Sequence, residues 1–187
     1  MAPVLPHYCR SEEEFLALCQ RLKLTPCPFC KLIGALIRHG DLYGYGERDE
    51  NRKSRRGHRI FCNNRKARKN GCGHTFSVWA ADKLRRLRLD AATLWTFLEL
   101  VLELANQAQA LRNLNLDLSP SYAYCLWKRF RNAQSHIRTA LAKRLAAPKL
   151  PKALLAEAQT LAHVKAAFPG AACPIVEFQY QLQTSFL

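Results

Sequence analysis

Four cysteines arranged in two pairs constrain the fold of this chain more than any other feature of its sequence. Cys27 and Cys30 enclose two residues in CPFC, whereas Cys62 and Cys72 enclose nine residues in CNNRKARKNGC. Two residues between thiolates form a tight turn that lets both sulfur atoms reach one metal ion. Glycines flank Cys72 and allow the backbone to turn beneath a metal-bound sulfur. The pattern predicts a structural Zn²⁺ ion held by all four cysteines in a zinc ribbon, a small β-structure with two ligand-bearing hairpins.

Other interpretations of the cysteines stay open at the level of sequence. CPFC can be a redox pair, although the segment after it does not have the pattern of a thioredoxin-like βαβ unit. The cysteines can also be two unrelated sets of buried thiols, and His74 or His58 can replace one of them as a zinc ligand. The remaining cysteines have no ligand spacing, and we expect each to be a small buried apolar residue: Cys9, Cys19, Cys125 and Cys173.

The chain carries a large excess of positive charge, with 29 Lys and Arg residues, 14 Asp and Glu residues and a formal net charge of +15. A nucleic-acid backbone is the commonest partner of such an excess, because neutralising phosphates releases counterions. An anionic membrane surface is the rival partner, and a basic surface that only confers solubility is the third interpretation. We expect a nucleic acid, with DNA favoured over RNA, and no membrane partner.

The sequence contains no apolar run near the ~20 residues that span a bilayer, and no basic segment followed by an apolar one at its N-terminus. These features predict a cytoplasmic protein, associated with the nucleoid if the source is bacterial. In such a reducing compartment, the eight cysteines are expected to be free or metal-bound rather than disulfide-linked.

The periodicity of the sequence predicts an α+β fold, mainly α, in which a small β zinc ribbon precedes a helical bundle with a helix-turn-helix. Residues 1–24 hold a short helix with Ser11 as its N-cap. Residues 25–80 form the zinc ribbon with its basic loop, and GHRIFC and HTFSVW are strand-like segments within it. Residues 81–147 form the helical domain, and residues 148–187 form a C-terminal helix and tail.

More local predictions accompany this organisation. Residues 41–56 have the polar composition of a long loop, and helical character begins at Asp82. Residues 90–105 form a helix that is apolar on nearly its whole circumference, which is typical of the centre of a bundle. A last helix covers about residues 152–167, and PIVEFQYQLQ alternates after it like a strand.

The segment from CPFC to GHRIFCNNRKARKNGCGHTFSVW resembles the N-terminal zinc ribbon of bacterial insertion-sequence transposases over roughly residues 25–80. In that family, a C-x2-C pair is followed by a segment of the type G-x-R-aromatic-x-C and then by C-G-basic-T-F. The residues that match this pattern approximately are Gly57, Arg59, Phe61, Cys62, Cys72, Gly73, His74, Thr75 and Phe76. The resemblance implies metal and nucleic-acid binding, and the later helices are similar in kind to the helix-turn-helix of such proteins.

The chain departs from the pattern of that family at three places. The spacer from Cys30 to Cys62 is long, and the spacer from Cys62 to Cys72 is wider than the usual pair. His74 stands where a basic residue is common. The resemblance therefore speaks more strongly for a metal and a nucleic acid than for one particular set of ligands.

Residues 106–144 have the pattern of a helix, a turn and a long helix, which is the order of a helix-turn-helix. Ser119 as N-cap and Pro120 at the first helical position mark the start of the long helix, which extends to Ala147. In a helix-turn-helix, this second helix enters the major groove of DNA with its N-terminal residues at the base edges. A plain helical bundle with a solvated basic face is the alternative. The side chains expected to contact nucleic acid are Ser121, Tyr122, Tyr124, Lys128, Arg129 and Arg131.

Basic side chains in and around the ribbon form a second group with an expected role in nucleic-acid binding. A charge run is usually a solvated face, but one so long and of a single sign repels itself without a counter-charge. A metal at Cys62 and Cys72 would pin both ends of the loop between them and hold its charges toward phosphate. The expected contacts are Arg55, Arg56, Arg59, Arg65, Lys66, Arg68, Lys69 and His74.

The sequence does not contain the carboxylate pattern of a DNA-cutting enzyme. A transposase cuts with carboxylates that hold two divalent metal ions, whereas only Glu157 and Glu177 follow the predicted helix-turn-helix. No nucleophile motif or phosphate-binding loop is present either. We expect no catalytic residue and no enzyme activity, but DNA recognition by a transposase-derived or mobile-element protein whose catalytic subunit is separate. The alternatives are a non-catalytic subunit of a larger nucleoprotein complex, such as a CRISPR-type effector, and a truncated or divergent transposase or nuclease.

Overall fold

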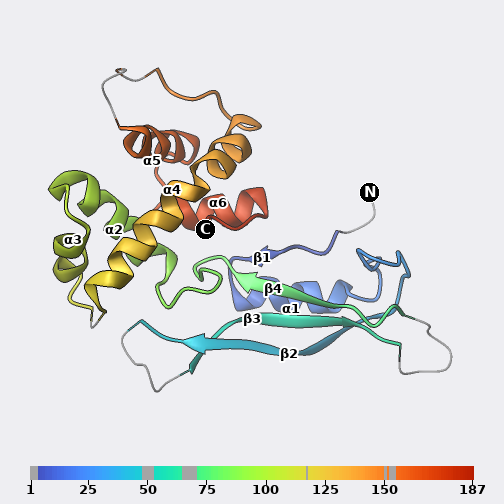
Figure 1. The fold of residues 1–187 in the computed structure, drawn as a ribbon. Helices are drawn as coiled ribbons and strands as arrows, with labels where there is room; N and C mark the ends of the chain where they lie inside the picture. The colour runs from blue at the N-terminus through green and yellow to red at the C-terminus, as the bar shows by residue number, and fades with distance from the viewer. Residues whose placement is uncertain (1–3, 48–52, 65–70, 117, 150, 152–154) are drawn as a thin grey trace. The chain divides into compact units, whose positions relative to one another are not determined.

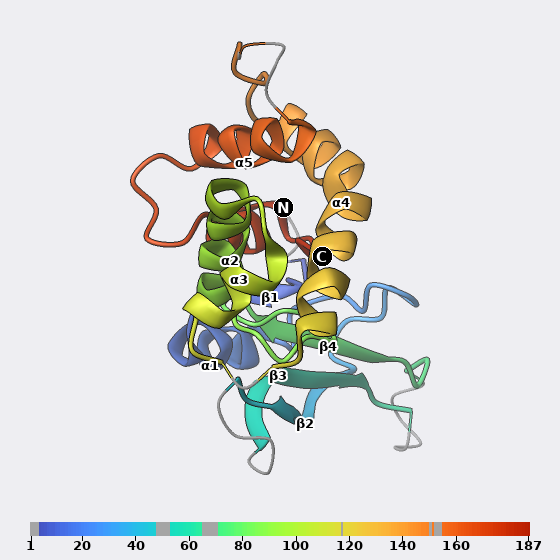
Figure 2. The same cartoon turned by 60° about the vertical axis from the view of Figure 1, so that its left-hand side comes forward.

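The computed structural model describes residues 4–47, 53–64, 71–116, 118–149, 151 and 155–187, and these residues form two compact units. Within them, unit 1 comprises residues 4–46 and 53–83, and unit 2 comprises Glu47 and residues 84–187. Unit 1 is built on a sheet, and the regular elements of unit 2 in the described residues are helices (Figures 1 and 2). The α+β class expected from the sequence is therefore confirmed.

The sheet of unit 1 has the strand order β1-β4-β3-β2 among the described residues. Both β2 and β4 pair antiparallel with β3, and the short β1 pairs parallel with β4. The strands span Tyr8–Cys9 (β1), Leu36–Tyr45 (β2), Lys53–Cys62 (β3) and Thr75–Ala80 (β4). GHRIFC lies within β3 and TFSVW within β4, so both strand segments are confirmed except at His74, which precedes β4.

The long polar loop predicted over residues 41–56 is largely wrong. Asp41 is paired with His58 across β2 and β3, and Tyr45 is paired with Lys53, so polar residues on both sides of the connection belong to strands. Their backbones supply the ladder hydrogen bonds, while side chains such as those of Tyr43 and Lys53 point to solvent. Residues 48–52, at the middle of the predicted loop, lie outside the described residues.

One face of the sheet is covered by helix α1 (Glu12–Arg21), which the sequence predicted (Figure 1). The Ser11 hydroxyl accepts a hydrogen bond from the Glu14 N–H at 3.3 Å, so Ser11 caps the helix as expected. Phe15 and Leu18 of α1 are buried in one apolar cluster with residues of β2, β3 and β4: Leu36, Ile60 and Val78. This packing holds α1 against the sheet, whose strand β3 ends at Cys62, one of the four predicted metal ligands.

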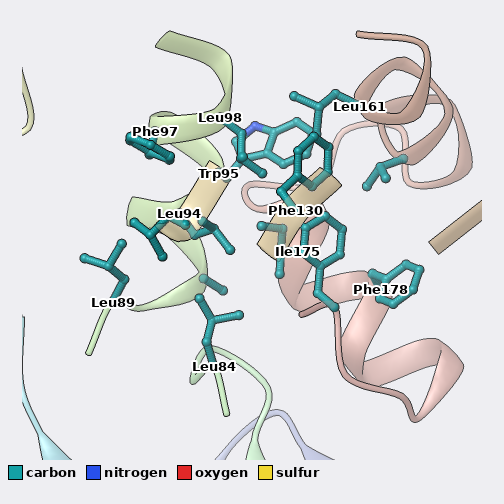
Figure 3. Packing of buried hydrophobic residues seen from close by; sticks show 14 of the residues in the cluster. Leu84, Leu89, Leu94, Trp95, Phe97, Leu98, Phe130, Leu161, Ile175 and Phe178 are labelled. Carbon is teal, nitrogen blue, oxygen red and sulfur yellow. The ribbon is translucent and has the colours of Figure 1, made fainter. Parts of the chain in front are cut away.

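Unit 2 contains helices α2 (Ala91–Leu104), α3 (Gln107–Asn113), α4 (Pro120–Ala142), α5 (Ala156–Ala167) and α6 (Pro174–Leu182). Figure 3 shows side chains of α2, α4 and α6 meeting in the core of this unit. Leu94, Leu98, Phe130 and Phe178 are among its fully buried members, which agrees with the central position expected for the apolar helix at residues 90–105. No helix in the described part of the chain combines the length and apolar character that crossing a bilayer requires.

The start of α2 is capped by a residue distant in sequence. Asp90 is the N-cap residue, but its side chain makes no capping hydrogen bond. The Glu47 carboxylate accepts instead, from the Asp90 N–H and from the Thr93 hydroxyl, the latter at 3.0 Å. An acidic group at this position stabilises the positive end of the helix dipole.

Three helix and strand boundaries differ from the sequence prediction. Residues 82–89 form turns rather than helix, because Arg86 has a φ of 57°, a left-handed conformation that cannot continue an α-helix. The long helix α4 ends at Ala142 rather than Ala147. The last helix, predicted over about residues 152–167, spans Ala156–Ala167, with Leu155 as its N-cap, and residues 152–154 lie outside the described residues.

The fourth difference is the largest, because PIVEFQYQLQ forms helix α6 and not a strand. Pro174 lies in the first turn, where its missing N–H costs nothing. Ile175, Phe178 and Gln179 are all buried, and their spacing of three and four residues is that of one helical face. The Gln179 side chain accepts a hydrogen bond from the Phe186 N–H at 3.3 Å, which ties the C-terminal residues to this helix.

Candidate metal centre and nucleic-acid interface

The four predicted metal ligands come together at one end of the sheet in unit 1. Cys27 and Cys30 lie in the turns before β2, Cys62 ends β3, and Cys72 precedes β4. Their Sγ atoms all lie within 4.8 Å of one another. The Cys27–Cys72 and Cys30–Cys62 sulfur pairs are both 3.7 Å apart. A tetrahedral ion with metal–sulfur bonds of about 2.3 Å places its ligands about 3.8 Å apart, so the cluster has the dimensions of a structural metal site.

The first pair is held by a tight backbone turn. The Cys27 carbonyl accepts a hydrogen bond from the Lys31 N–H at 2.9 Å, and the Cys27 N–H donates to the Leu32 carbonyl at 3.0 Å. Lys31 has a φ of 62°, which brings the chain back beneath the sulfur atoms. A hydrogen bond from the Leu32 backbone lowers the pKa of the Cys30 thiol to about 7, which favours the thiolate that a metal requires.

The second pair is joined by hydrogen bonds between the residues that carry the sulfurs. The Cys72 N–H donates to the Cys62 Sγ at 3.3 Å, and the Gly73 N–H donates to the Cys62 carbonyl at 3.1 Å. Burial is the main reason that the pKa of the Cys62 thiol rises to about 12. A buried thiol of this kind ionises when a cation replaces its proton, so a metal would satisfy the cluster as a whole.

Neither histidine considered as a ligand joins the sulfur cluster in the described structure. His58 is buried, and its two ring nitrogens lie 2.8 Å from Asp41 Oδ1 and 3.1 Å from Glu12 Oε2. Its ring stacks on Phe15 with the centroids 3.5 Å apart, so His58 joins α1 to the sheet. His74 is exposed and stacks on Phe29 with the ring centroids 3.8 Å apart.

The other cysteines differ in their surroundings. All eight cysteines lie within the described residues and are unbridged. Cys9 is buried as predicted, while Cys19 and Cys173 are half-buried. The prediction of a buried residue is wrong for Cys125, which lies on the exposed side of α4. This exposed thiol, outside the metal cluster, provides a control for substitutions of the ligands.

The basic residues predicted in the ribbon have different structural roles. Arg59 is exposed, and no ion pair to it is found among the described residues. Arg55 is paired with Glu12 at 2.8 Å. Arg56 is only 5% exposed and donates from Nη1 to the Tyr45 carbonyl at 2.9 Å, so its prediction as a nucleic-acid contact is wrong. The remaining predicted contacts of this loop lie outside the described residues: Arg65, Lys66, Arg68 and Lys69.

The residues predicted on the long helix of unit 2 are exposed with one exception. Ser121, Tyr124, Lys128, Arg129 and Arg131 are all exposed on α4. Tyr122 differs from the prediction, because it is half-buried rather than exposed. Its hydroxyl accepts a hydrogen bond from the Arg88 N–H at 3.4 Å.

The exposed cations of α4 differ in whether a carboxylate neutralises them. Arg131 is paired with Glu157 of α5 at 3.1 Å. Arg129 donates from Nη1 to the Arg86 carbonyl at 3.5 Å, a neutral partner. No ion pair to Lys128 or Arg129 is found in the described part of the chain. Lys128 and Arg129 therefore present positive charges that no carboxylate of the described residues neutralises.

Comparisons of the chain with protein-family models, curated proteins and solved structures find no match. The functional argument consequently rests on the chemistry of the residues themselves. That chemistry consists of four thiols at metal-binding distance in unit 1 and of exposed cations on β3 and α4.

Proposed function

We propose that this protein binds nucleic acid, with DNA preferred over RNA, and that a structural zinc ion held by Cys27, Cys30, Cys62 and Cys72 maintains the fold of its sheet unit. The observation that carries the proposal is the meeting of four thiols in a chain with a net charge of +15. The ion would stabilise structure, and the surrounding cations would bind phosphate. Such a division of roles suits a DNA-recognition protein of transposase or mobile-element origin without a catalytic domain.

The choice of zinc rests on ligand type and geometry. Four thiolates in a tetrahedron bind Zn²⁺ or an iron centre, and four protein ligands leave no open position for catalysis. The ligands also join segments that are distant in sequence, from the turn at Cys27 to the loop at Cys72. Because a preformed site of this kind rarely exists in the unfolded chain, the free energy of metal binding adds to the free energy of folding.

The choice of nucleic acid rests on the balance of charges. Several arginines already have carboxylate partners within the fold, including Arg38 with Asp41 and Arg55 with Glu12. The overall excess of cations means that the carboxylates cannot neutralise all of them. Exposed residues such as Arg59, Lys128 and Arg129 then remain for an anionic partner, and a phosphate backbone supplies closely spaced charges.

The zinc part is tested by measuring metal content in protein purified without added metal. We expect one equivalent of zinc per chain by elemental mass spectrometry, and loss of this zinc in the Cys62→Ser variant. Cys125→Ser is the matched control, since it removes an exposed cysteine outside the cluster and should keep the metal. Wild-type protein with no bound metal would contradict this part of the proposal. Visible absorption typical of iron bound to thiolates would show that the metal is iron rather than zinc.

The nucleic-acid part is tested by selecting bound sequences from a random duplex DNA pool at two salt concentrations, with RNA as competitor. Enrichment of one sequence motif supports DNA recognition, whereas binding without enrichment favours a subunit of a larger nucleoprotein complex. Salt dependence alone does not separate the two, because every phosphate-binding protein shows it. Nicking of a supercoiled plasmid that needs Mg²⁺ or Mn²⁺, and that is lost on carboxylate substitution, would instead establish a nuclease.

A further inference from the structure

A groove with a volume of about 970 Å³ lies in unit 2 between α4 and the beginning of α5. One wall comes from α4, with Tyr124, Trp127, Lys128 and Arg131, and the opposite wall comes from Leu155, Ala156 and Glu157. Its size is at the upper end of the range of about 300–1,000 Å³ that small-molecule pockets occupy. The groove therefore has room for a nucleotide-sized ligand.

The walls of the groove are joined by polar contacts between the two helices. Arg138 of α4 donates from Nε to the Thr160 hydroxyl at 2.7 Å and from Nη2 to the Ala156 carbonyl. The Gln134 side chain accepts a hydrogen bond from the same hydroxyl at 3.0 Å. Figures 1 and 2 both show α5 against the C-terminal half of α4. These contacts hold the start of α5 beside α4, so the groove is built into the fold.

The position of the groove bears on how α4 can contact nucleic acid. A helix that reads duplex DNA enters the major groove with a convex face. Tyr124, Lys128 and Arg131 are separated by four and three residues and share one helical face, and all three line the groove. The side chains expected to read bases in a duplex thus face a hollow whose second wall is Leu155–Glu157. A hollow suits a ligand that projects into it, such as a base that is not paired.

The aromatic residues of the groove suit a flat ligand. Tyr124 is 57% exposed, so its ring is accessible to a ligand in the groove. Trp127 is half-buried against Phe130, with ring centroids 5.6 Å apart, and lines the groove one helical turn away. Leu155 on the other wall is 64% exposed. Stacking on exposed aromatic rings is the main way in which proteins hold unpaired bases without sequence preference.

The distribution of charge in the groove leaves a neutral part that suits a base and a positively charged part that suits a phosphate. Glu157 has a side chain that is 13% exposed, and its ion pair with Arg131 neutralises the cation at one end. Lys128 is exposed on the rim, and no ion pair to it is found within the described ranges. One uncompensated cation next to aromatic rings matches a single nucleotide, whose phosphate is charged and whose base is not.

We propose that this groove binds an unpaired base of a single-stranded nucleic acid, which stacks on Tyr124 while Lys128 contacts the adjoining phosphate. The proposal rests on the nucleic-acid-binding function proposed above and names its substrate class. The shared chemistry is that of a single strand, which DNA and RNA both supply. Stacking accepts every base, so the groove contributes affinity with little sequence preference.

The test uses the whole chain, purified with any metal it retains, and fluorescence anisotropy with three probes: oligo-dT, oligo-U and a duplex hairpin. The single strands have about 12 nucleotides, within the usual site size of stacking proteins. We expect Tyr124→Ala to lower the affinity for single strands about tenfold, the effect of losing one base stack, and to leave the affinity for the hairpin unchanged. The matched control is Tyr43→Ala, since Tyr43 is a similarly exposed tyrosine, at 62%, on β2.

A second measurement reports on stacking itself and does not depend on affinity. A 2-aminopurine base within the single strand should lose fluorescence on saturation with wild-type protein and with Tyr43→Ala, because stacking quenches it. Saturation with Tyr124→Ala should leave more of this fluorescence. Circular dichroism of each variant verifies that it is folded. The strand type that binds more tightly, DNA or RNA, identifies the source of the ligand.

The failures of the two proposals are distinguishable. Equal losses for single strands and hairpin in Tyr124→Ala would overturn the groove assignment, because the face then contacts a duplex. Unchanged binding of all probes in this variant would also overturn it, and would leave the groove to another ligand such as a protein segment. Both results leave the nucleic-acid function intact, whereas wild-type protein that binds none of the probes overturns that function and the groove assignment with it.

Discussion

A side-chain carbon at Gly71 would lie 2.8 Å from the Sγ atom of Cys62 and 2.4 Å from the Asn63 carbonyl oxygen. Both distances are far shorter than van der Waals contact, and the Asn63 carbonyl belongs to the backbone. Cys62 would have to move away from the position in which it meets the other three thiols. Glycine at residue 71 is therefore needed for the arrangement of the four thiols, although it contributes no sulfur atom.

The first prediction is that Gly71→Ala lowers the affinity for the metal about tenfold, the range found when groups that orient metal ligands are changed. Competition with a chelator measures this affinity. Gly170→Ala is the control, since Gly170 has a φ of 73° but nothing within 4 Å of an added carbon. It should cost stability through backbone strain and leave metal affinity unchanged. An equal metal affinity in wild type and Gly71→Ala would contradict the role assigned to the glycine.

The second prediction concerns the pH dependence of the Asp41–His58 contact. The hydrogen bond from His58 is the main reason that the pKa of the Asp41 carboxyl is lowered in the folded protein. A carboxyl with a lowered folded pKa adds stability above its unfolded pKa of about 4, and this stability is lost as the pH falls through the folded pKa. Asp41→Asn should therefore reduce the free energy of unfolding by about 1–2 kcal/mol at neutral pH, and this loss should become smaller as the pH falls below the unfolded pKa of about 4.

Urea unfolding at several pH values measures this difference. Asp82→Asn is a suitable control, because the Asp82 side chain is 53% exposed and forms an ion pair with the neighbouring Lys83 at 3.1 Å. A surface pair of this kind contributes less than about 1 kcal/mol. A destabilisation by Asp41→Asn that stays constant from pH 7 to pH 3 would show that the carboxylate charge is not its cause.

The meeting of the four cysteines was predictable from sequence although the two pairs lie far apart along the chain, because thiols that can share one metal ion stand out as a residue type. The spacing of a C-x2-C pair allows both sulfur atoms to reach one metal ion. A second pair of thiols in the same β unit can supply the other two ligands of a tetrahedral site. Helix starts were similarly visible, since Ser11 acts on the N–H of Glu14, only three residues away. In the first case the signal is a repeated residue type, cysteine, and in the second it is an interaction between residues that are close in sequence.

Features that depend on tertiary pairing were not predictable in this way. The polar residues of β2 and β3 form strands because their backbones pair across a hairpin, and side-chain polarity carries no signal of that pairing. In PIVEFQYQLQ, apolar side chains at every second position from Val176 to Leu182 imitate a strand. Ile175 and Phe178, three residues apart, equally suit one helical face, and so short a segment does not separate the two patterns. Arg56 is buried because β2 and β3 pack its aliphatic part near Gly44, which no local pattern reveals.

The third prediction separates two arginines on the same strand. Arg59 is exposed, so Arg59→Ala should weaken nucleic-acid binding and reduce the slope of log affinity against log salt by about 0.9 on duplex DNA, without changing the unfolding temperature. Arg56→Ala should have the opposite profile, because it removes a buried hydrogen bond to the Tyr45 carbonyl and costs about 2 kcal/mol of stability. Anisotropy titrations at several salt concentrations and thermal unfolding measure both quantities. A change of the salt slope in folded Arg56→Ala, or none in Arg59→Ala, would contradict the assignment.

The last prediction uses the ion pair between Arg131 and Glu157, whose atoms are 3.1 Å apart. As long as Glu157 holds Arg131, this arginine contributes little net charge to the groove. Glu157→Gln should therefore raise the affinity for single-stranded nucleic acid and increase the salt slope by about 0.7, the value for one additional phosphate contact on a single strand. Glu177→Gln on α6 removes the same charge away from the groove and is the control for a general change in net charge. Equal gains in both variants would mean that Arg131 is not released toward a phosphate, and a double variant with Arg131→Ala should abolish the gain specific to Glu157→Gln.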